Sequence, residues 1–402
     1  MLSMLKIIVT TVVGKFLYLT DIHYDPDYAE GAPTKCFLDN IGVTCCHNYD
    51  IHRFGAEKAN KWGDYNCDTS PHFFNKSMEW IKETHADIDM IMFPGDSAGH
   101  EDIYNTPSVI LDSVDAVFNQ FKTKYPNIPV LSAVGNHETY PIDQTMPILY
   151  PYLLYNFGES MKKTLPYRAL QYFRKTGSYT YRMGNNTRFV SFNSIYYNNM
   201  NAFRDDRSIL LDDGVKWLYD TLYKSEKLGE NIWFLTHMFP GAGGTTPAYN
   251  AVMLDIFHRF RNTIVYQFYG HTHNDQLTVY EKDGDIFGGG WTGPSMMPDN
   301  RFPSYRIYEY DKDNMKILDY TQYLANMSKV MELDRVVYEP HYRYSEVYGD
   351  DLSAIGMYNR IVGGMEDEYC KYFTPGRNKC DTSNLVVRRE DYDIPEPNVE
   401  LR

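Results

Sequence analysis

The chain has 402 residues, of which 43% are apolar and 15% aromatic, enough for the core of one large α/β domain or of two domains. Its 53 acidic and 39 basic residues give a formal net charge of −14. No long basic run occurs, which argues against a protein that binds nucleic acid or docks on an anionic membrane. An acidic protein that handles phosphate must supply positive charge locally, and bound divalent cations would do so.

The N-terminus carries one lysine in a short apolar stretch, from Met1 to Gly14. This pattern is typical of a signal peptide, which we place at residues 1–15, although a first β-strand would look similar. No later run is long or apolar enough to span a bilayer.

Six cysteines form two local groups, an even number that indicates disulfides in an oxidising compartment. A zinc site made of cysteines is the weaker interpretation, because no C-x₂-C pair occurs. Three N-glycosylation sequons also favour a secreted or endolysosomal protein, and they begin at Asn75, Asn185 and Asn326.

Five short apolar runs are each followed by polar residues, as expected of strands in a covered sheet that end in turns. In chain order they are Phe16–Thr20 before Asp21 and His23, Asp89–Phe93 before Asp96, Pro129–Val134 before Asn136 and His137, Asn231–Leu235 before His237, and Val265–Tyr269 before His271 and His273.

Helical periodicity occupies four segments between these strands: Phe74–His85, Val109–Lys124, Leu211–Ser225 and Ala251–Phe260. Alternating strands and helices predict an α/β layered fold, in which ligands bind at the carboxyl ends of strands. From about Tyr310 the pattern loosens into charged, Tyr-rich stretches. We assign residues 311–385 to a small helical C-terminal extension and residues 386–402 to an acidic tail.

Each polar cluster alone is a weak signal, since Asp-x-His pairs are common on surfaces and single histidines are common in cores. Together, the five strand ends present carboxylates, an amide oxygen and imidazoles. Those donors suit borderline metals such as zinc, manganese or iron. The order D-x-H, G-D, G-N-H, H, G-H-x-H resembles the signature of the calcineurin-like metallophosphoesterases.

Further motifs are similar to the acid sphingomyelinase-like phosphodiesterases of that superfamily. They are Phe16–Pro26 (FLYLTDIHYDP), the adjacent Cys45 and Cys46, Gly95–His100, Gly270–Asp275 and the later stretch Tyr305–Ala325. The resemblance implies a four-layer sandwich, with a central β-sandwich flanked by helices, and a catalytic domain over residues 16–310.

The resemblance also implies site residues. One metal ion would be held by Asp21, His23, Asp96 and His273, and the other by Asp96, Asn136, His237 and His271, with zinc as the expected metal. His100 and His137 match family histidines near the substrate phosphate. His137 is our candidate general acid, because an imidazole titrates near neutrality; His100 would share that role or bind the phosphate. We expect structural or surface roles for the remaining histidines: His47, His52, His72, His85, His258 and His341.

For the cysteines, the resemblance and the short spacing suggest the pairs Cys36–Cys45, Cys46–Cys67 and Cys370–Cys380. Four N-terminal cysteines allow three pairings, so this connectivity needs an independent observation.

The function that the resemblance implies is a secreted phosphodiesterase that uses metal-hydroxide attack on nucleotides or phosphocholine-type substrates. Alternatives are a sphingomyelin phosphodiesterase, an endopolyphosphatase-like hydrolase and a secreted binding protein that retains the fold. Acid sphingomyelinase itself carries a lipid-binding domain before the catalytic core, whereas here the first core strand starts near Phe16. We therefore expect soluble small-molecule substrates and no membrane contact. We also expect a monomer and no nucleic-acid polymer as a partner.

Overall fold

The computed structural model describes residues 12–37, 44–51, 55–100, 105–184, 186–204, 209, 212–298, 301–374, 380, 382 and 385–392. Most of the expected signal peptide lies outside these residues. Its last three residues, Val13 to Lys15, belong to the first strand and pair with the strand that begins at Ser304. For them the strand interpretation holds, and cleavage after residue 15 would remove half of that strand.

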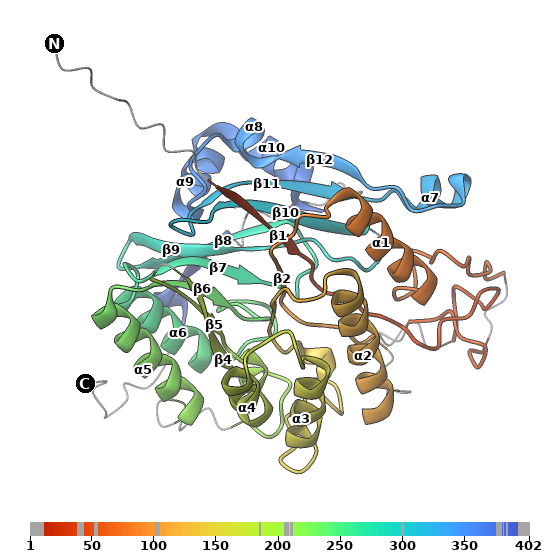
Figure 1. Ribbon diagram of the computed structural model, residues 1–402, viewed down its shortest axis with the longest axis horizontal. Coiled ribbons are helices and arrows are strands. Elements are labelled where there is room, and N and C mark those ends of the chain that lie inside the picture. The colour runs from red at the N-terminus through yellow and green to blue at the C-terminus, as the bar shows by residue number, and fades with distance from the viewer. Residues whose placement is uncertain are drawn as a thin grey trace.

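Two mixed sheets face each other with helices on their outer sides (Figure 1). The first sheet has the strand order β12 (Glu339–Arg343), β11 (Ile317–Leu324), β10 (Ser304–Asp311), β1 (Val13–Tyr18), β2 (Met90–Phe93) and β3 (Val130–Ser132). The second has the order β13 (Val386–Arg388), β8 (Gln276–Lys282), β9 (Asp285–Thr292), β7 (Ile264–Tyr269), β6 (Asn231–Leu235), β5 (Thr187–Ser191) and β4 (Tyr179–Gly184). The α/β sandwich expected from the sequence is confirmed.

The helices begin where the sequence supplies caps. The side chain of Ser70 accepts a hydrogen bond from the backbone of Phe73 at the start of α1 (Pro71–Thr84), and Thr106 and Thr246 cap α2 (Pro107–Lys124) and α6 (Pro247–Arg259) in the same way. The other helices are α3 (Tyr150–Ser160), α4 (Tyr167–Thr176), α5 (Asp213–Leu228), α7 (Met327–Leu333), α8 (Tyr344–Tyr348), α9 (Ala354–Arg360) and α10 (Glu366–Phe373). None of the helices described is long and apolar enough to cross a bilayer.

Aromatic side chains fill the space between the sheets. Phe16 of β1 lies 5.5 Å from Trp233 of β6 and 6.1 Å from Phe268 of β7, measured between ring centroids, and stacks on Tyr308 of β10 at 4.6 Å. Rings from both sheets are therefore buried against one another in this core.

The C-terminal part differs from the expected helical extension and tail. Strands β11 and β12 complete one side of the first sheet, so residues 311–385 are not a separate helical unit. Residues 386–388 form β13 and pair in parallel with β8, and Val387 is buried, so the first part of the expected tail belongs to the second sheet.

All six cysteines are paired as Cys36–Cys45, Cys46–Cys67 and Cys370–Cys380, which confirms the suggested connectivity. Three disulfides in one chain indicate an oxidising compartment.

Candidate metal centre

The polar clusters gather because the strands before them run parallel. β1, β2 and β3 are parallel neighbours in one sheet, and β5, β6 and β7 are parallel neighbours in the other. Backbone hydrogen bonds continue past the strand ends, from Asp21 to Gly95, from His23 to Asp96 and from Gly270 to His237. The loops that follow the strands therefore meet at one edge of the sandwich.

Five of the seven residues expected to bind metal have a left-handed backbone. The φ angles are 49° for Asp21, 47° for His23, 59° for Asp96, 74° for His271 and 59° for His273. Non-glycine residues seldom adopt this conformation, and such strain is concentrated at functional sites.

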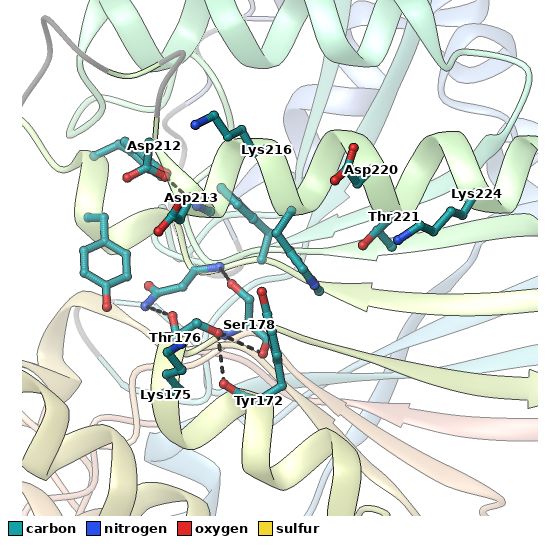
Figure 2. A pocket seen from close by; sticks show the side chains of 16 residues that line it. Tyr172, Lys175, Thr176, Ser178, Asp212, Asp213, Lys216, Asp220, Thr221 and Lys224 are labelled. Atoms are coloured by element: carbon teal, nitrogen blue, oxygen red, sulfur yellow. Dashed lines mark hydrogen bonds between the residues drawn. The ribbon is translucent and has the colours of Figure 1, made fainter.

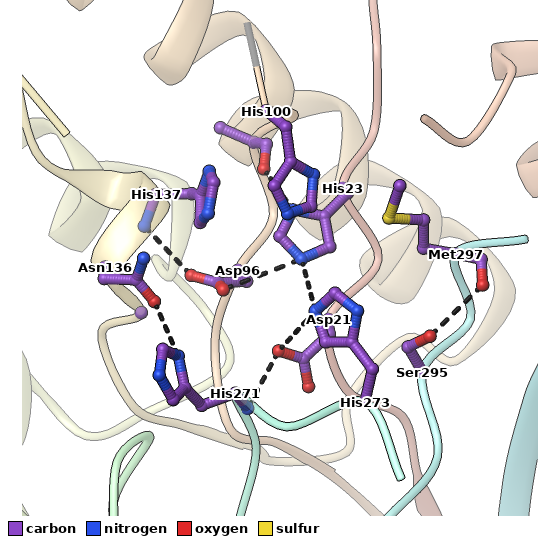
Figure 3. Close-up of polar contacts among 12 residues, drawn as sticks. Asp21, His23, Asp96, His100, Asn136, His137, His271, His273, Ser295 and Met297 are labelled. Atoms are coloured by element: carbon purple, nitrogen blue, oxygen red, sulfur yellow. Dashed lines mark hydrogen bonds and ion pairs between the residues drawn. The ribbon is translucent and has the colours of Figure 1, made fainter. Parts of the chain in front are cut away.

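One group of possible ligand atoms comes from Asp21, His23, Asp96 and His273, all within 4.8 Å of one another (Figure 3). Nε2 of His23 lies 3.0 Å from Nε2 of His273 and 3.6 Å from Oδ2 of Asp96, and Nε2 of His273 lies 3.4 Å from Oδ1 of Asp21. His100 meets the same distance criterion with His23 and His273.

A second group comes from Asp96, His237 and His271. Nε2 of His237 lies 3.1 Å from Oδ2 of Asp96, and Oδ1 of Asn136 lies 2.9 Å from the same nitrogen and 3.1 Å from Nδ1 of His271. Asp96 belongs to both groups. The structure thus brings together all seven residues that the sequence singled out.

The tautomers of two histidines follow from their partners. Nδ1 of His23 faces the carbonyl oxygen of Ala98 at 2.9 Å, and Nδ1 of His237 faces that of Pro94 at 3.1 Å. Because a carbonyl oxygen only accepts hydrogen bonds, each Nδ1 carries a proton, and Nε2 of each ring is the atom that can bind a metal. Burial lowers the pKa of His237, but Asp96 outweighs this and raises it to about 9, so the ring must release its Nε2 proton when a metal binds. The donor set and its convergence therefore fit two divalent metal ions.

The two carboxylates of the site are ionised. Burial raises the pKa of Asp96, but nearby His237 and His137 more than offset this and hold it well below its usual range. Burial also raises the pKa of Asp21, and His273 reverses that effect, so its pKa is lowered. Two buried negative charges at the centre of a histidine cluster provide the charge that a divalent cation needs.

Glu138 holds the turn that presents Asp96 and Asn136. Its carboxylate accepts backbone hydrogen bonds from Gly135 at 2.6 Å, from Asp96 at 3.0 Å and from Ser97. The sequence shows Glu138 in the G-N-H-E motif, but nothing in the motif indicates that two of its three partners, Asp96 and Ser97, belong to another loop.

His137 and His100 lie beside the first group of ligand atoms. The backbone N–H of His137 donates to Oδ1 of Asp96 at 3.0 Å, and its Nδ1 lies 3.1 Å from the carbonyl oxygen of Gly99. The His100 ring stacks on that of His23 at 3.9 Å and lies 4.3 Å from that of His137.

Asp68 is a buried residue that the sequence did not single out. Its Oδ1 lies 2.8 Å from Nδ1 of His100, and its Oδ2 accepts the backbone N–H of the same residue at 2.6 Å. Asp68 follows Cys67, whose disulfide to Cys46 anchors this segment.

Among the other histidines, His47 lies between Asp25 and Asp50, at 3.0 Å and 3.1 Å, and His85 lies 3.0 Å from the hydroxyl of Tyr305. His52 is outside the described residues.

A cavity of about 540 Å³ lies between α4 and α5, and none of the seven residues lines it (Figure 2). Tyr172 and Trp217 stack there at 5.0 Å. Its charged lining includes Lys175 from α4 and Lys216, Asp220 and Lys224 from α5.

Comparison with known proteins relates the chain to phosphoesterases. Residues 14–275 match the calcineurin-like phosphoesterase family. The chain is 30% identical over 346 residues to sphingomyelin phosphodiesterase 2 of Caenorhabditis elegans, covering 78% of this chain and 56% of the relative. It is 26% identical over 385 residues to sphingomyelin phosphodiesterase B of Dictyostelium discoideum, covering 90% of this chain and 59% of the relative. The chain therefore spans less than two thirds of these two proteins.

The chain is also similar to a nucleotide phosphodiesterase and to a solved phosphatase structure. The human cyclic GMP-AMP phosphodiesterase SMPDL3A is 25% identical over 368 residues, covering 86% of this chain and 78% of that protein. Among solved structures, a dimetal phosphatase from Danio rerio superposes with a TM-score of 0.48 at 11% identity, over 82% of this chain and 99% of that one.

Proposed function

The chain belongs to the calcineurin-like phosphoesterase family, and we propose that it is a phosphodiesterase with two divalent metal ions. Asp21, His23, Asp96 and His273 hold one ion in this proposal, and Asp96, Asn136, His237 and His271 hold the other. The observation that carries the proposal is the shared Asp96, which lies in both groups of converging ligand atoms. We propose zinc as the metal, because imidazole and carboxylate donors suit it.

When bound, two metal ions would supply positive charge for an anionic phosphodiester and would lower the pKa of a water molecule towards neutrality. The chain's own contribution is orientation. The carbonyl oxygens of Ala98 and Pro94 fix the rings of His23 and His237, and Glu138 fixes the loop that carries Asp96. A site held by such outer contacts stays in position before substrate arrives.

The departing oxygen needs a proton, and we propose His137 as its source. The Gly99 carbonyl accepts the proton on Nδ1 of His137, so Nε2 can give a proton only when the ring is an imidazolium. Burial and nearby His100 lower the pKa of His137 to about 4, and the negative charge of a bound phosphodiester would favour the imidazolium that this role requires. His100 is held by Asp68 next to His137 and is placed to bind a phosphate oxygen or to share the proton transfer.

The substrates we propose are small phosphodiesters or phosphoanhydrides of the nucleotide and phosphocholine types. A cyclic GMP-AMP phosphodiesterase aligns with 86% of this chain, which supports a nucleotide substrate. Release of phosphocholine from sphingomyelin is the second candidate, because sphingomyelin phosphodiesterases align at 26–30% identity.

A substrate panel on purified protein tests the proposal. The metal-stripped protein is reconstituted with zinc, manganese or iron and offered CDP-choline, ATP, a dinucleotide, polyphosphate and sphingomyelin. We expect metal-dependent cleavage, with the soluble diesters faster than sphingomyelin in bilayers. If sphingomyelin in bilayers is the best substrate, the second candidate replaces the first; if the metal-loaded protein cleaves none of them, the phosphodiesterase proposal is wrong.

We also propose that the protein is secreted or resides in the endolysosomal lumen. Oδ1 of Asn75 accepts from the side chain of Gln120 and Oδ1 of Asn326 caps α7, which leaves the amide nitrogen of each for a glycan. Asn185 lies outside the described residues. A mass decrease after enzymatic deglycosylation of protein from a eukaryotic host would support this localisation, and an unmodified chain would argue against it.

A further inference from the structure

The helical hairpin formed by α3 and α4 is basic in an acidic protein. Residues 148–176 contain five basic residues, Lys162, Lys163, Arg168, Arg174 and Lys175, and one acidic residue, Glu159. This segment therefore has a formal charge of +4, whereas the whole chain has −14. The basic residues are spread over 14 positions, so they form no run in the sequence.

The same hairpin exposes large apolar and aromatic side chains. Ile148 is 89% exposed, Tyr152 and Tyr155 are each 53% exposed, and Tyr167 is 72% exposed. Figure 1 shows α3 and α4 side by side at the outer margin of the molecule. Tyr152 and Tyr155 lie three positions apart on α3 and therefore share one face of that helix. Exposed apolar side chains grouped in this way mark a site of interaction.

Arg174 joins the exposed sides of the two helices. Its guanidinium lies 5.3 Å from the ring centroid of Tyr155 and pairs with Glu159. Lys162 also pairs with Glu159, so the one acidic residue of the hairpin is already neutralised.

Three basic residues of the hairpin remain available. Lys163, Arg168 and Lys175 are exposed, and none of them forms an ion pair with another residue that the structure describes. The opposite side of α4 is buried, since its residues Ala169, Leu170 and Phe173 pack into the core.

We propose that the α3–α4 hairpin docks the protein on an anionic lipid surface. Lysine and arginine side chains are attracted to anionic headgroups, and each strengthens association by about fivefold. Tyrosine rings favour the level of the headgroups, where one end of the ring is apolar and the other is wet. Because the apolar face of α4 already packs in the core, docking is shallow and sensitive to salt.

An anionic polymer would satisfy the basic residues but would leave Ile148 and the tyrosines in water. The combination of positive charge with exposed apolar side chains therefore favours a bilayer. This inference departs from the expectation drawn from the sequence, where the absence of a basic run spoke against membrane contact. It is independent of the reaction proposed above.

The test is co-sedimentation of the full-length, metal-loaded protein with vesicles of phosphatidylcholine alone or mixed with phosphatidylserine. We expect binding to the mixed vesicles only, weakened by added salt. The triple variant Lys163→Glu, Arg168→Glu, Lys175→Glu should bind at least about 100-fold more weakly. A control variant carries the same change in charge at exposed lysines elsewhere, Lys35→Glu, Lys58→Glu and Lys227→Glu, and should retain most of the binding.

A second variant separates a bilayer from a polymer. Tyr167→Ser should weaken binding to mixed vesicles several-fold and leave retention on a heparin column unchanged. Equal binding to neutral and anionic vesicles, equal loss in both triple variants, or unaltered vesicle binding by Tyr167→Ser would each overturn the proposal. Turnover of a soluble phosphodiester should be the same in the hairpin variant and in the unmodified protein, so a failure here is distinct from a failure of the proposed reaction.

Discussion

Asp68 holds His100 by two hydrogen-bonding contacts, one to the ring nitrogen Nδ1 at 2.8 Å and one to the backbone N–H at 2.6 Å. Burial raises the pKa of the Asp68 carboxyl, but His100 reverses this and the pKa is lowered, so the carboxylate is charged where it meets the imidazole. The contact fixes the plane of a ring that stacks on His23. Asp68 is thus a positioning residue for a histidine at the edge of the metal centre.

We predict that Asp68→Ala lowers kcat by about 10–100-fold, the usual effect of removing a partner that orients a functional histidine. The measurement is steady-state hydrolysis of a phosphodiester in the wild-type and His100→Ala backgrounds. In the His100→Ala background the same change should have little further effect, because the ring it orients is gone. Additive losses would show that Asp68 acts on the site by another route.

We predict that Asp96→Asn abolishes activity and lowers the metal content of both positions. An amide cannot supply the negative charge that two cations share, whereas a carboxylate can. The measurement is metal analysis of the purified variant together with turnover. Asp87→Asn, at a surface position that pairs with Lys15, is the matched control and should leave both quantities unchanged. Full activity in a metal-free preparation would contradict the proposed centre.

The sequence predicted the strands of the metal centre because each combines a short apolar run with polar residues in the turn that follows it. β6 covers the predicted Asn231–Leu235, and α2 begins at Pro107, only two residues before the predicted start. The seven candidate metal residues came from the resemblance to the calcineurin-like metallophosphoesterases, and the parallel pairing of their strands explains why they converge at one edge.

Other features depend on contacts that no local pattern records. Asp68 contacts a residue 32 positions away, and Glu138 contacts backbone groups 41 and 42 positions away. β11 and β12 were missed because charged residues interrupt their apolar pattern: the buried Asp319 in β11, and Glu339 and Arg343 in β12, which is the edge strand of the sheet. The basic surface of the α3–α4 hairpin was also missed, because folding brings together basic residues that are separated in the sequence.

We predict that His137→Ala retains both metal ions and loses turnover by about 10²–10⁴-fold, the range expected for loss of a general acid. His137 is not among the grouped ligand atoms, so metal content should not fall. The loss should be smaller for p-nitrophenyl esters, whose leaving group needs no proton. Equal losses on good and poor leaving groups would indicate that His137 positions the substrate instead.

The last prediction concerns stability in acid and rests on His85, far in sequence from the metal residues. His85 is 7% exposed and bonds to the hydroxyl of Tyr305. Burial, with a smaller effect of Lys15, lowers its pKa from 6.5 to about 4. The unfolded chain therefore takes up a proton as the pH falls below 6.5, while the folded protein takes it up only near 4. The stability that the neutral imidazole contributes is fully present above pH 6.5 and is lost as the pH falls through this window, by about 3 kcal/mol at most.

His85→Gln keeps a polar partner for Tyr305 but does not titrate. Between pH 7 and pH 4, its free energy of unfolding, measured by urea denaturation, should fall by less than that of the wild type. His72→Gln, at an exposed histidine, should follow the wild type closely. If the wild type and His85→Gln lose the same free energy over this range, the buried imidazole does not contribute to acid sensitivity.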